Sequence, residues 1–468
     1  MSKIKKNIFV ENVEIIDIST EGKSIAKIDG MVIFLEGGVP GDIADVLITR
    51  KKNNYAEGHI TALKKESENR ITPKCEHFGV CGGCKWQHLN YKIQLYFKQK
   101  MVSDALTRIA KLDITSLKPI IPNSENYDYR NKLEFSFSDK KWLTSAEIKS
   151  AEVFDNCNAL GFHIPKMFDK ILDINHCHLQ AEPSNTIRNE IKKFANKNNF
   201  TFYNVRNKTG LLRTLMIRNS IQGELMVLIQ FFENQQENIT TLLTHLKKTF
   251  PNITSLQYVI NQKGNDTLQG LDIITFYGRD HIFEEMEGLK YKISAKSFYQ
   301  TNSKQALKLY NITRDLCQLK GNEIVYDLYT GTGTIANFIA KKAKKVIGVE
   351  YIEDAVIDAK HNSERNNILN TVFFAGDMKD VLNEQFIKTH GQPDVIITDP
   401  PRAGMHEDVI NTLLKIAAEK IIYVSCNPAT QARDLEMLIK VYDIAEIQPV
   451  DMFPQTAHVE NVVLLVKK

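Results

Sequence analysis

The chain lacks the long apolar runs and the large excess of one charge that mark several classes of protein. No apolar stretch in its 468 residues approaches membrane-spanning length, and the basic first residues lack the apolar core and cleavage site of a signal peptide. We therefore expect a cytoplasmic protein with no membrane partner. The net charge is only +4, which permits nucleic acid as a partner without requiring it.

Cysteine is also scarce. Seven cysteines, an odd number, argue against the disulfide framework of small secreted proteins. Three of the seven lie within residues 75–84, and such clustering in a cytosolic chain indicates metal binding or catalysis. The cysteines are Cys75, Cys81, Cys84, Cys157, Cys177, Cys317 and Cys426.

The N-terminal part is expected to be a small barrel. A chain of 468 residues should hold about two to four domains, and residues 7–63 read as short strands separated by turn residues. Five such strands suggest a closed barrel of the oligonucleotide-binding kind, within a domain of residues 1–66. Two groups of basic residues either form a solvated face or contact phosphates: Lys3, Lys5 and Lys6, and Arg50, Lys51 and Lys52.

Three segments follow the barrel. Residues 67–88 have the composition of a loop and hold the first three cysteines, whereas residues 89–118 show helical spacing and are expected to pack on the catalytic domain. Residues 119–290, which include Cys177, mix strand-like runs with a helix around 182–197 and predict an α+β domain. The order of its strands does not follow from one sequence.

Residues 291–468 predict an α/β domain. Five strand-like cores (EIVYDLY, KKVIGVE, TVFFAGD, DVIITDP and KIIYVSC) alternate with helical stretches, as in a parallel, doubly wound sheet. The last two strand-like runs, AEIQPVDMFP and NVVLLVKK, leave no room for a helix between them and should form an antiparallel hairpin. A seven-stranded sheet of this topology is typical of class I, Rossmann-like methyltransferases.

Candidate cofactor-binding residues follow the first strands of this sheet. Asp327 precedes Gly331 and Gly333, which let the backbone approach a ligand, and Glu350 ends the second strand, where an acid accepts hydrogen bonds from ribose hydroxyls. The glycine spacing alone also fits a dinucleotide site. The acid at position 327 and the Asp399-Pro-Pro-Arg motif favour S-adenosylmethionine instead.

The reacting residues are expected at the same edge of the sheet. An aromatic residue follows Asp-Pro-Pro in amine methyltransferases, but here the next residue is Arg402, which favours methylation of carbon. C5 of uracil becomes nucleophilic only after a nucleophile adds at C6, and a thiolate such as that of Cys426 suits this role. Its departure then needs a base to remove the C5 proton, for which Glu460 is the candidate.

The cysteine cluster predicts a metal site. Cys75-x5-Cys81-x2-Cys84 supplies three soft ligands in a glycine-rich loop, and either Cys157 or Cys177 could supply the fourth. Four thiolates suit zinc or a [4Fe–4S] cluster, and spacing does not separate the two.

With these motifs assembled, the whole chain resembles the iron–sulfur 23S rRNA (uracil-5)-methyltransferases. The resemblance rests on Tyr129-Arg-Asn-Lys132, Ser297-Phe-Tyr-Gln-Thr-Asn302, Asp399-Pro-Pro-Arg-Ala-Gly404, Ser425-Cys-Asn-Pro-Ala-Thr430 and the run from Asp451 to Glu460. It implies that residues 7–63 form a TRAM domain, the RNA-binding barrel of this family. It also implies a [4Fe–4S] cluster on four cysteines, with Cys177 preferred to Cys157: Cys75, Cys81, Cys84 and Cys177.

The resemblance also implies the chemistry. Cys426 would be the nucleophile and Glu460 the proton acceptor in the formation of 5-methyluridine in 23S rRNA. No obligate protein partner is implied. S-adenosylmethionine would be contacted by Gln300, Tyr329 (Phe in some members), Glu350 and Asp399, beside Asp327, Gly331 and Gly333.

Three other functions remain open at this point. Some relatives methylate the T-loop of transfer RNA rather than 23S rRNA. A non-catalytic RNA-binding protein would not need the intact set of Asp327, Glu350, Cys426 and Glu460. An electron-transfer iron–sulfur protein is disfavoured because the sequence holds ligands for one cluster only.

Overall fold

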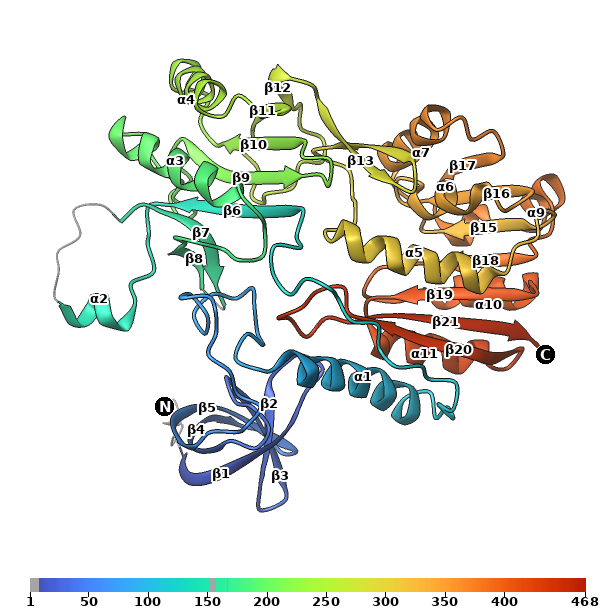
Figure 1. Ribbon diagram of the computed structural model, residues 1–468, viewed down its shortest axis with the longest axis horizontal. Coiled ribbons are helices and arrows are strands. Elements are labelled where there is room, and N and C mark those ends of the chain that lie inside the picture. The colour runs from blue at the N-terminus through green and yellow to red at the C-terminus, as the bar shows by residue number, and fades with distance from the viewer. Residues whose placement is uncertain (1–7, 151–156, 166) are drawn as a thin grey trace.

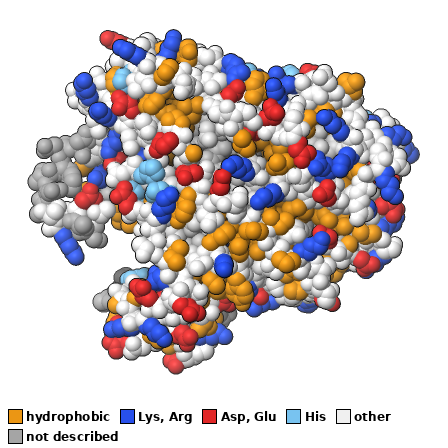
Figure 2. Space-filling view, viewed as in Figure 1, with side chains coloured by type: hydrophobic (Ala, Val, Ile, Leu, Met, Phe, Trp, Pro, Cys, Tyr) orange, Lys and Arg blue, Asp and Glu red, His pale blue; other side chains and the backbone are white. Residues whose placement is uncertain are grey.

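The computed structural model describes residues 8–150, 157–165 and 167–468, so Lys3, Lys5 and Lys6 lie outside the described residues. A small barrel, a central α+β part and a C-terminal α/β part are visible in Figure 1. Figure 2 shows the barrel projecting from the body, with a concave outline between the barrel and the central part. Among the described residues, no helix combines the length and apolar character needed to cross a bilayer.

The N-terminal strands close into a five-stranded barrel in the order β1-β2-β3-β5-β4, which confirms the expected architecture. Alternate side chains, among them Ile15, Ile33, Leu35 and Val46, fill its interior because successive residues of a strand point to opposite faces. The strands are β1 (Ile8–Ile18), β2 (Ser24–Ile28), β3 (Met31–Glu36), β4 (Ile43–Lys51) and β5 (Tyr55–Lys65).

Helix α1 (Tyr91–Arg108) lies between the barrel and the C-terminal part (Figure 1). Its N-terminus is capped by Asn90, whose side-chain oxygen accepts a hydrogen bond from the amide of Lys92 at 3.0 Å. One side of the helix packs in a small apolar cluster with the barrel, and the other side packs in the core of the C-terminal part. Helix α1 therefore connects the barrel to the core of the C-terminal part.

The central part is a seven-stranded sheet in the order β12-β11-β10-β9-β6-β7-β8. Helices α3 and α4 cover one of its faces and share an apolar core with it. The elements are β6 (Lys132–Ser138), α2 (Ser145–Ser150), β7 (Ala159–Ile164), β8 (Met167–Asp173), α3 (Ser184–Lys197), β9 (Leu212–Asn219), β10 (Leu225–Phe231), α4 (Gln236–Thr249), β11 (Ser255–Ile260) and β12 (Ile274–Gly278).

The C-terminal sheet has the order β17-β16-β15-β18-β19-β21-β20, which confirms the expected seven-stranded methyltransferase topology. Strand β21 runs antiparallel to both neighbours, as the expected hairpin requires. The strands are β15 (Ile324–Leu328), β16 (Lys345–Glu350), β17 (Thr371–Ala375), β18 (Val395–Thr398), β19 (Lys420–Ser425), β20 (Tyr442–Val450) and β21 (Glu460–Lys467).

Both faces of this sheet are covered. On one face α5, α6 and α7 share a core with the strands and with the hairpin of β13 and β14, whereas α1, α10 and α11 contribute to the core on the other face. The elements are β13 (His281–Met286), β14 (Leu289–Ser294), α5 (Ser303–Cys317), α6 (Thr334–Ala340), α7 (Glu353–Arg365), α8 (Met378–Val381), α9 (Glu384–His390), α10 (Glu407–Ile416) and α11 (Pro428–Leu438).

The exposed lysines at the end of β4 allow the RNA-binding role of the barrel to be tested. If Lys51 and Lys52 contact phosphates, the double variant Lys51→Gln/Lys52→Gln should bind RNA more weakly. The slope of log affinity against log salt should flatten by about 0.7–0.9 for each lysine–phosphate interaction that the substitution removes. Fluorescence anisotropy at several salt concentrations measures this slope.

The matched control is Lys341→Gln/Lys342→Gln. This exposed pair lies between the end of α6 and the start of β16, on the side of the sheet opposite to the carboxyl ends of its parallel strands. This control should leave the slope unchanged. Equal slopes for the barrel variant and the wild type would show that Lys51 and Lys52 form a solvated face and do not contact phosphates.

Candidate active site

The parallel strands of the C-terminal sheet deliver four polar side chains to one edge. Strands β15, β16, β18 and β19 run parallel, so their carboxyl ends meet at the same side of the sheet. In open α/β sheets, ligands bind at this edge. The side chains at or just beyond these ends are Asp327, Glu350, Asp399 and Cys426.

A turn of unusual backbone geometry follows β15. Tyr329, Gly331 and Gly333 have φ angles of 60°, 55° and 72°, in the left-handed region that favours glycine. A Cβ atom at Gly333 would approach the Cβ of Ala359 to 2.8 Å, so position 333 requires glycine for packing as well. A Cβ atom at Gly331 would meet nothing within 4 Å, so the backbone there faces open space in which a ligand could approach.

Glu350 is held against this turn. One carboxylate oxygen accepts a hydrogen bond from the amide of Gly331 at 3.0 Å, and the other accepts from the amide of Ile352 at 2.9 Å. The segment that contains Gln300 lies nearby, since the Thr332 hydroxyl is 3.5 Å from the carbonyl oxygen of Phe298. The turn, the acid and this segment therefore border one site.

Cys426 and Glu460 lie on neighbouring strands. Cys426 directly follows β19 and Glu460 begins β21, and the two strands pair Ser425 with Asn461. Glu460 is buried, whereas Cys426 is partly exposed. The structure thus brings the two expected reacting residues together.

Burial disfavours negative charge on three carboxyl groups near this end of the sheet. It raises the pKa of Asp399 to about 7, with a further contribution from Asp327, and it raises the pKa of Glu460 well above its usual value, with a further contribution from Asp399. Asp327 is affected in the same way, since burial raises its pKa to about 7. A cluster of buried carboxyl groups favours a ligand that carries positive charge.

The pKa of Cys426 depends on its neighbours. Burial, followed by the negative charges of Glu460 and Asp399, raises it to about 11, whereas the charge of Arg402 and a hydrogen bond from its guanidinium group lower it. Arg402 is thus the one neighbour among these groups that favours the reactive thiolate.

Arg402 and His458 were part of the quoted motifs, but the sequence assigned neither a role. A guanidinium nitrogen of Arg402 lies 3.1 Å from Nδ1 of His458. His458 is exposed at the surface, but desolvation by nearby chain atoms, followed by the charge of Arg402, lowers its pKa to about 4, so the neutral imidazole accepts a hydrogen bond from Arg402. The backbone of Arg402 is held as well, because its carbonyl accepts hydrogen bonds from Asn427 and Thr430 at 3.0 and 3.1 Å.

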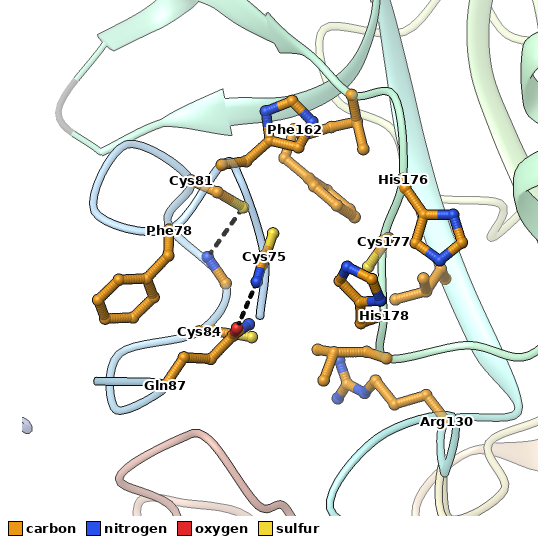
Figure 3. Close-up of a pocket in the computed structure, with 15 residues that line it drawn as sticks. Cys75, Phe78, Cys81, Cys84, Gln87, Arg130, Phe162, His176, Cys177 and His178 are labelled. Carbon is orange, nitrogen blue, oxygen red and sulfur yellow. Dashed lines mark hydrogen bonds between the residues drawn. The ribbon is translucent and has the colours of Figure 1, made fainter. Parts of the chain in front are cut away.

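The four cysteines expected to bind metal line one pocket of about 80 Å³. In Figure 3, three of them belong to the glycine-rich loop, and the sulfur of Cys177 points toward that loop from the central part. Exposed Cys157 is not among the lining residues. Within the described residues, however, no group of three or more His, Cys, Asp or Glu side chains has the arrangement of a metal site. The four lining cysteines are Cys75, Cys81, Cys84 and Cys177.

The cysteines of this pocket influence one another. Burial, with smaller contributions from the other pocket cysteines, raises the pKa of Cys81 to about 11 and that of Cys84 to about 12. The Gln87 side chain fixes the start of the loop by accepting a hydrogen bond from the amide of Cys75 at 3.0 Å. Four soft donors around one pocket are a donor set that fits a thiolate-bound metal centre.

Comparison with known proteins decides the family. Residues 215–468 match the model of the tRNA (Uracil-5-)-methyltransferase family, and residues 10–61 match the TRAM domain. The chain belongs to the tRNA (uracil-5-)-methyltransferase family. It is therefore an RNA methyltransferase that uses S-adenosylmethionine, and its barrel is a TRAM domain.

Relatives and a solved structure extend over nearly the whole chain. An uncharacterized RNA methyltransferase of Bacteroides thetaiotaomicron is 53% identical over 96% of this chain and 99% of its own length. An uncharacterized RNA methyltransferase of Porphyromonas gingivalis is 51% identical over 97% of this chain and 99% of its own length. The Pyrococcus abyssi tRNA (uracil-54, C5)-methyltransferase, solved with S-adenosyl-L-homocysteine, superimposes with a TM-score of 0.75 at 28% identity, over 98% of this chain and 100% of that chain.

The contact between Arg402 and Cys426 predicts a change in thiol reactivity. Arg402→Met removes the neighbouring positive charge, so the pKa of Cys426 should rise. Below that pKa, alkylation of Cys426 by iodoacetamide should slow by about tenfold, since one pKa unit corresponds to a tenfold change in the thiolate fraction. Mass spectrometry of the Cys426 peptide across a pH series measures the rate at this cysteine alone.

Arg402→Lys is the control, because it retains the positive charge and should retain most of the reactivity. A Cys426 alkylation profile that is the same in wild type and Arg402→Met would show that Arg402 does not influence the thiol.

Proposed function

We propose that this methyltransferase forms 5-methyluridine in RNA through a covalent bond between Cys426 and C6 of the target uracil. The observation that carries this proposal is the placement of a partly exposed thiol and a buried carboxyl group on the paired strands β19 and β21. Addition of the thiol to C6 makes C5 of the uracil nucleophilic. A proton acceptor is then needed within reach of C5 of the same uracil.

The reaction assigns one step to each residue. The target uridine enters the site unstacked from its RNA neighbours. The sulfur of Cys426 adds to C6, and the resulting enolate attacks the methyl group of S-adenosylmethionine from C5. Glu460 removes the C5 proton, the C5–C6 double bond re-forms and the bond from C6 to sulfur breaks. Product RNA and S-adenosylhomocysteine leave, and the thiolate is restored.

The cofactor is proposed to lie along the turn after β15. Gly331 and Gly333 allow close approach of the backbone, Asp327 shapes the turn, and Glu350 is positioned to accept hydrogen bonds from ribose hydroxyls. The sulfonium group supplies positive charge opposite the buried carboxyl groups as well as the methyl group. The proposed contact residues are Gln300, Tyr329, Glu350 and Asp399, as the family resemblance implies.

We propose 23S rRNA as the substrate on the basis of that resemblance. The T-loop of transfer RNA is the second candidate, because the solved structure with a TM-score of 0.75 is a tRNA (uracil-54, C5)-methyltransferase. Both substrates place the reaction in the cytoplasm. In this assignment residues 1–66 bind RNA, and residues 67–88 together with Cys177 hold a metal centre. Residues 89–118 support the catalytic domain, residues 119–290 form the central domain, and residues 291–468 catalyse the reaction.

We also propose that Cys75, Cys81, Cys84 and Cys177 hold a [4Fe–4S] cluster. The four lie around one pocket, which supports Cys177 rather than exposed Cys157 as the fourth ligand. A bound cluster would supply cross-links between the glycine-rich loop and the central domain. Zinc remains the alternative that a four-thiolate site allows.

The covalent mechanism predicts different failures for the two reacting residues. Cys426→Ala cannot form the adduct, so it should transfer no methyl group and retain no RNA. Glu460→Gln retains the thiol, so it should add to C6, methylate C5 and then stall, with product release slowed by about 100-fold or more. Denaturing gel electrophoresis with methyl-labelled cofactor should detect a labelled protein–RNA complex in Glu460→Gln.

The trapped RNA also identifies the substrate. Sequencing the RNA released by proteolysis of the Glu460→Gln complex should return a site in 23S rRNA, whereas a T-loop sequence would assign the enzyme to transfer RNA. Normal turnover by Glu460→Gln without a trapped complex would require another base. Methyl transfer by Cys426→Ala would exclude covalent catalysis by this residue.

The cluster assignment predicts the composition of anaerobically purified protein. It should be brown and contain about four iron and four sulfide per chain. Cys177→Ser should lose the colour, whereas Cys157→Ser, which alters a cysteine outside the pocket, should keep it. Stoichiometric zinc without sulfide would contradict the [4Fe–4S] cluster. Colour loss only in Cys157→Ser would identify Cys157, rather than Cys177, as the fourth ligand.

A further inference from the structure

The segment that connects β20 to β21 has no helix or strand of its own. It comprises residues 451–459, begins with fully buried Asp451 and leads directly into Glu460. We call it the base-bearing segment because it ends next to Glu460, the first residue of β21, which pairs with Val450 of β20. Because no regular hydrogen-bond ladder holds residues 451–459, their position depends on contacts from neighbouring parts of the chain.

The strongest of these contacts come from Lys98 on helix α1. Its ammonium group lies 2.5 Å from one carboxylate oxygen of Asp451 and 2.9 Å from the carbonyl oxygen of Phe453. The hydroxyl of Tyr91, also on α1, donates to the other Asp451 oxygen at 2.8 Å. The side chains of Lys98 and Asp451 are both 0% exposed. Removal of either partner would leave the other charge buried without compensation, so the pair holds α1 and Asp451 together.

A second contact from α1 uses Gln94. Its side-chain nitrogen donates to the side-chain oxygen of Gln455 at 3.0 Å, and its side-chain oxygen accepts from the backbone amide of Gln455 at 3.0 Å. The carbonyl of Gln455 in turn accepts hydrogen bonds from the amides of Lys85 and Trp86 at 2.8 and 3.1 Å. Helix α1 and the two residues that follow Cys84 therefore hold the middle of the base-bearing segment.

Besides the contact of Arg402 with His458, two other parts of the chain hold the segment. The Tyr129 hydroxyl donates to the carbonyl of Pro454 at 2.9 Å, and the side-chain amide of Asn302 donates to the carbonyl of Met452 at 2.9 Å. Lys98 differs from these groups because it is charged and because it binds the segment at both Asp451 and Phe453.

We infer that Lys98 is a positioning residue for the proton-abstraction step, in that it holds the base-bearing segment so that Glu460 reaches the C5 proton. This inference rests on the proposed function. Cys426 follows β19, whose ladder with β18 and β21 does not include the segment, whereas Glu460 is the residue at which the segment joins β21 and pairs with Val450 of β20. Removal of the Lys98 side-chain amine should therefore slow breakdown of the covalent adduct more than its formation.

The test compares adduct formation and adduct breakdown in single-turnover experiments. Lys98→Met should form the labelled protein–RNA adduct at nearly the wild-type rate and break it down about 10- to 100-fold more slowly, as expected for a misplaced catalytic group. KM values for RNA and S-adenosylmethionine should change little. Lys92→Met, an exposed lysine one and a half turns away on the same helix, is the matched control and should behave as wild type.

A second variant keeps the test independent of folding. Lys98→Met leaves Asp451 buried without its charge partner, whereas Lys98→Met/Asp451→Asn removes both charges and should fold. The double variant lacks the same anchoring ion pair, so it should also accumulate adduct. Wild-type adduct breakdown in the double variant, or equal slowing of formation and breakdown, would overturn the inference.

Glu460→Gln, measured in parallel, separates this inference from the proposed mechanism. If Glu460→Gln forms no adduct, the covalent mechanism fails and the positioning role fails with it. If Glu460→Gln traps the adduct and the folded Lys98 variants do not, the mechanism stands and Lys98 has no positioning role.

Discussion

A buried ion pair between two distant parts of the chain joins helix α1 to the segment that precedes Glu460. Lys98 and Asp451 are separated by 353 positions in the sequence, yet their charged groups meet with no exposure to solvent. Burial lowers the pKa of Lys98, and the negative charge of Asp451 opposes this change. Such pairs add little net stability, but breaking one by removing a partner costs about 3–5 kcal/mol. The pair therefore specifies where helix α1 meets the segment before Glu460.

The same exclusion of water determines the chemistry at the sheet edge. Burial raises the pKa of Asp399 to about 7 and that of Cys426 to about 11, so neutral pH disfavours the thiolate in the free protein. Positive charge opposes this shift, and the guanidinium group of Arg402 lowers the pKa of Cys426. In the proposed reaction the sulfonium group of the cofactor adds a second positive charge. Nucleophile activation is thereby coupled to assembly of the complete site.

The sequence predicted those features that local patterns encode. The strand-like cores KKVIGVE, DVIITDP and KIIYVSC placed Glu350, Asp399 and Cys426 at strand ends, and the missing helix before NVVLLVKK correctly predicted the antiparallel last strand. Features created by distant contacts were not predictable. The pairing of Arg402 with His458 and the packing of α1 against the barrel depend on tertiary contacts. The order of the central strands likewise combines antiparallel pairs with the parallel pair of β10 and β11, which no local pattern specifies.

Release of the C5 hydrogen tests the central claim most directly. RNA that contains uridine tritiated at C5 is incubated with the enzyme and S-adenosylmethionine, and tritium released to water is compared with methyl groups incorporated. Methylation at C5 with proton abstraction by Glu460 predicts one tritium released for each methyl group transferred, and neither event in Cys426→Ala. Methyl incorporation without tritium release would place the methyl group on another atom and contradict the proposed reaction.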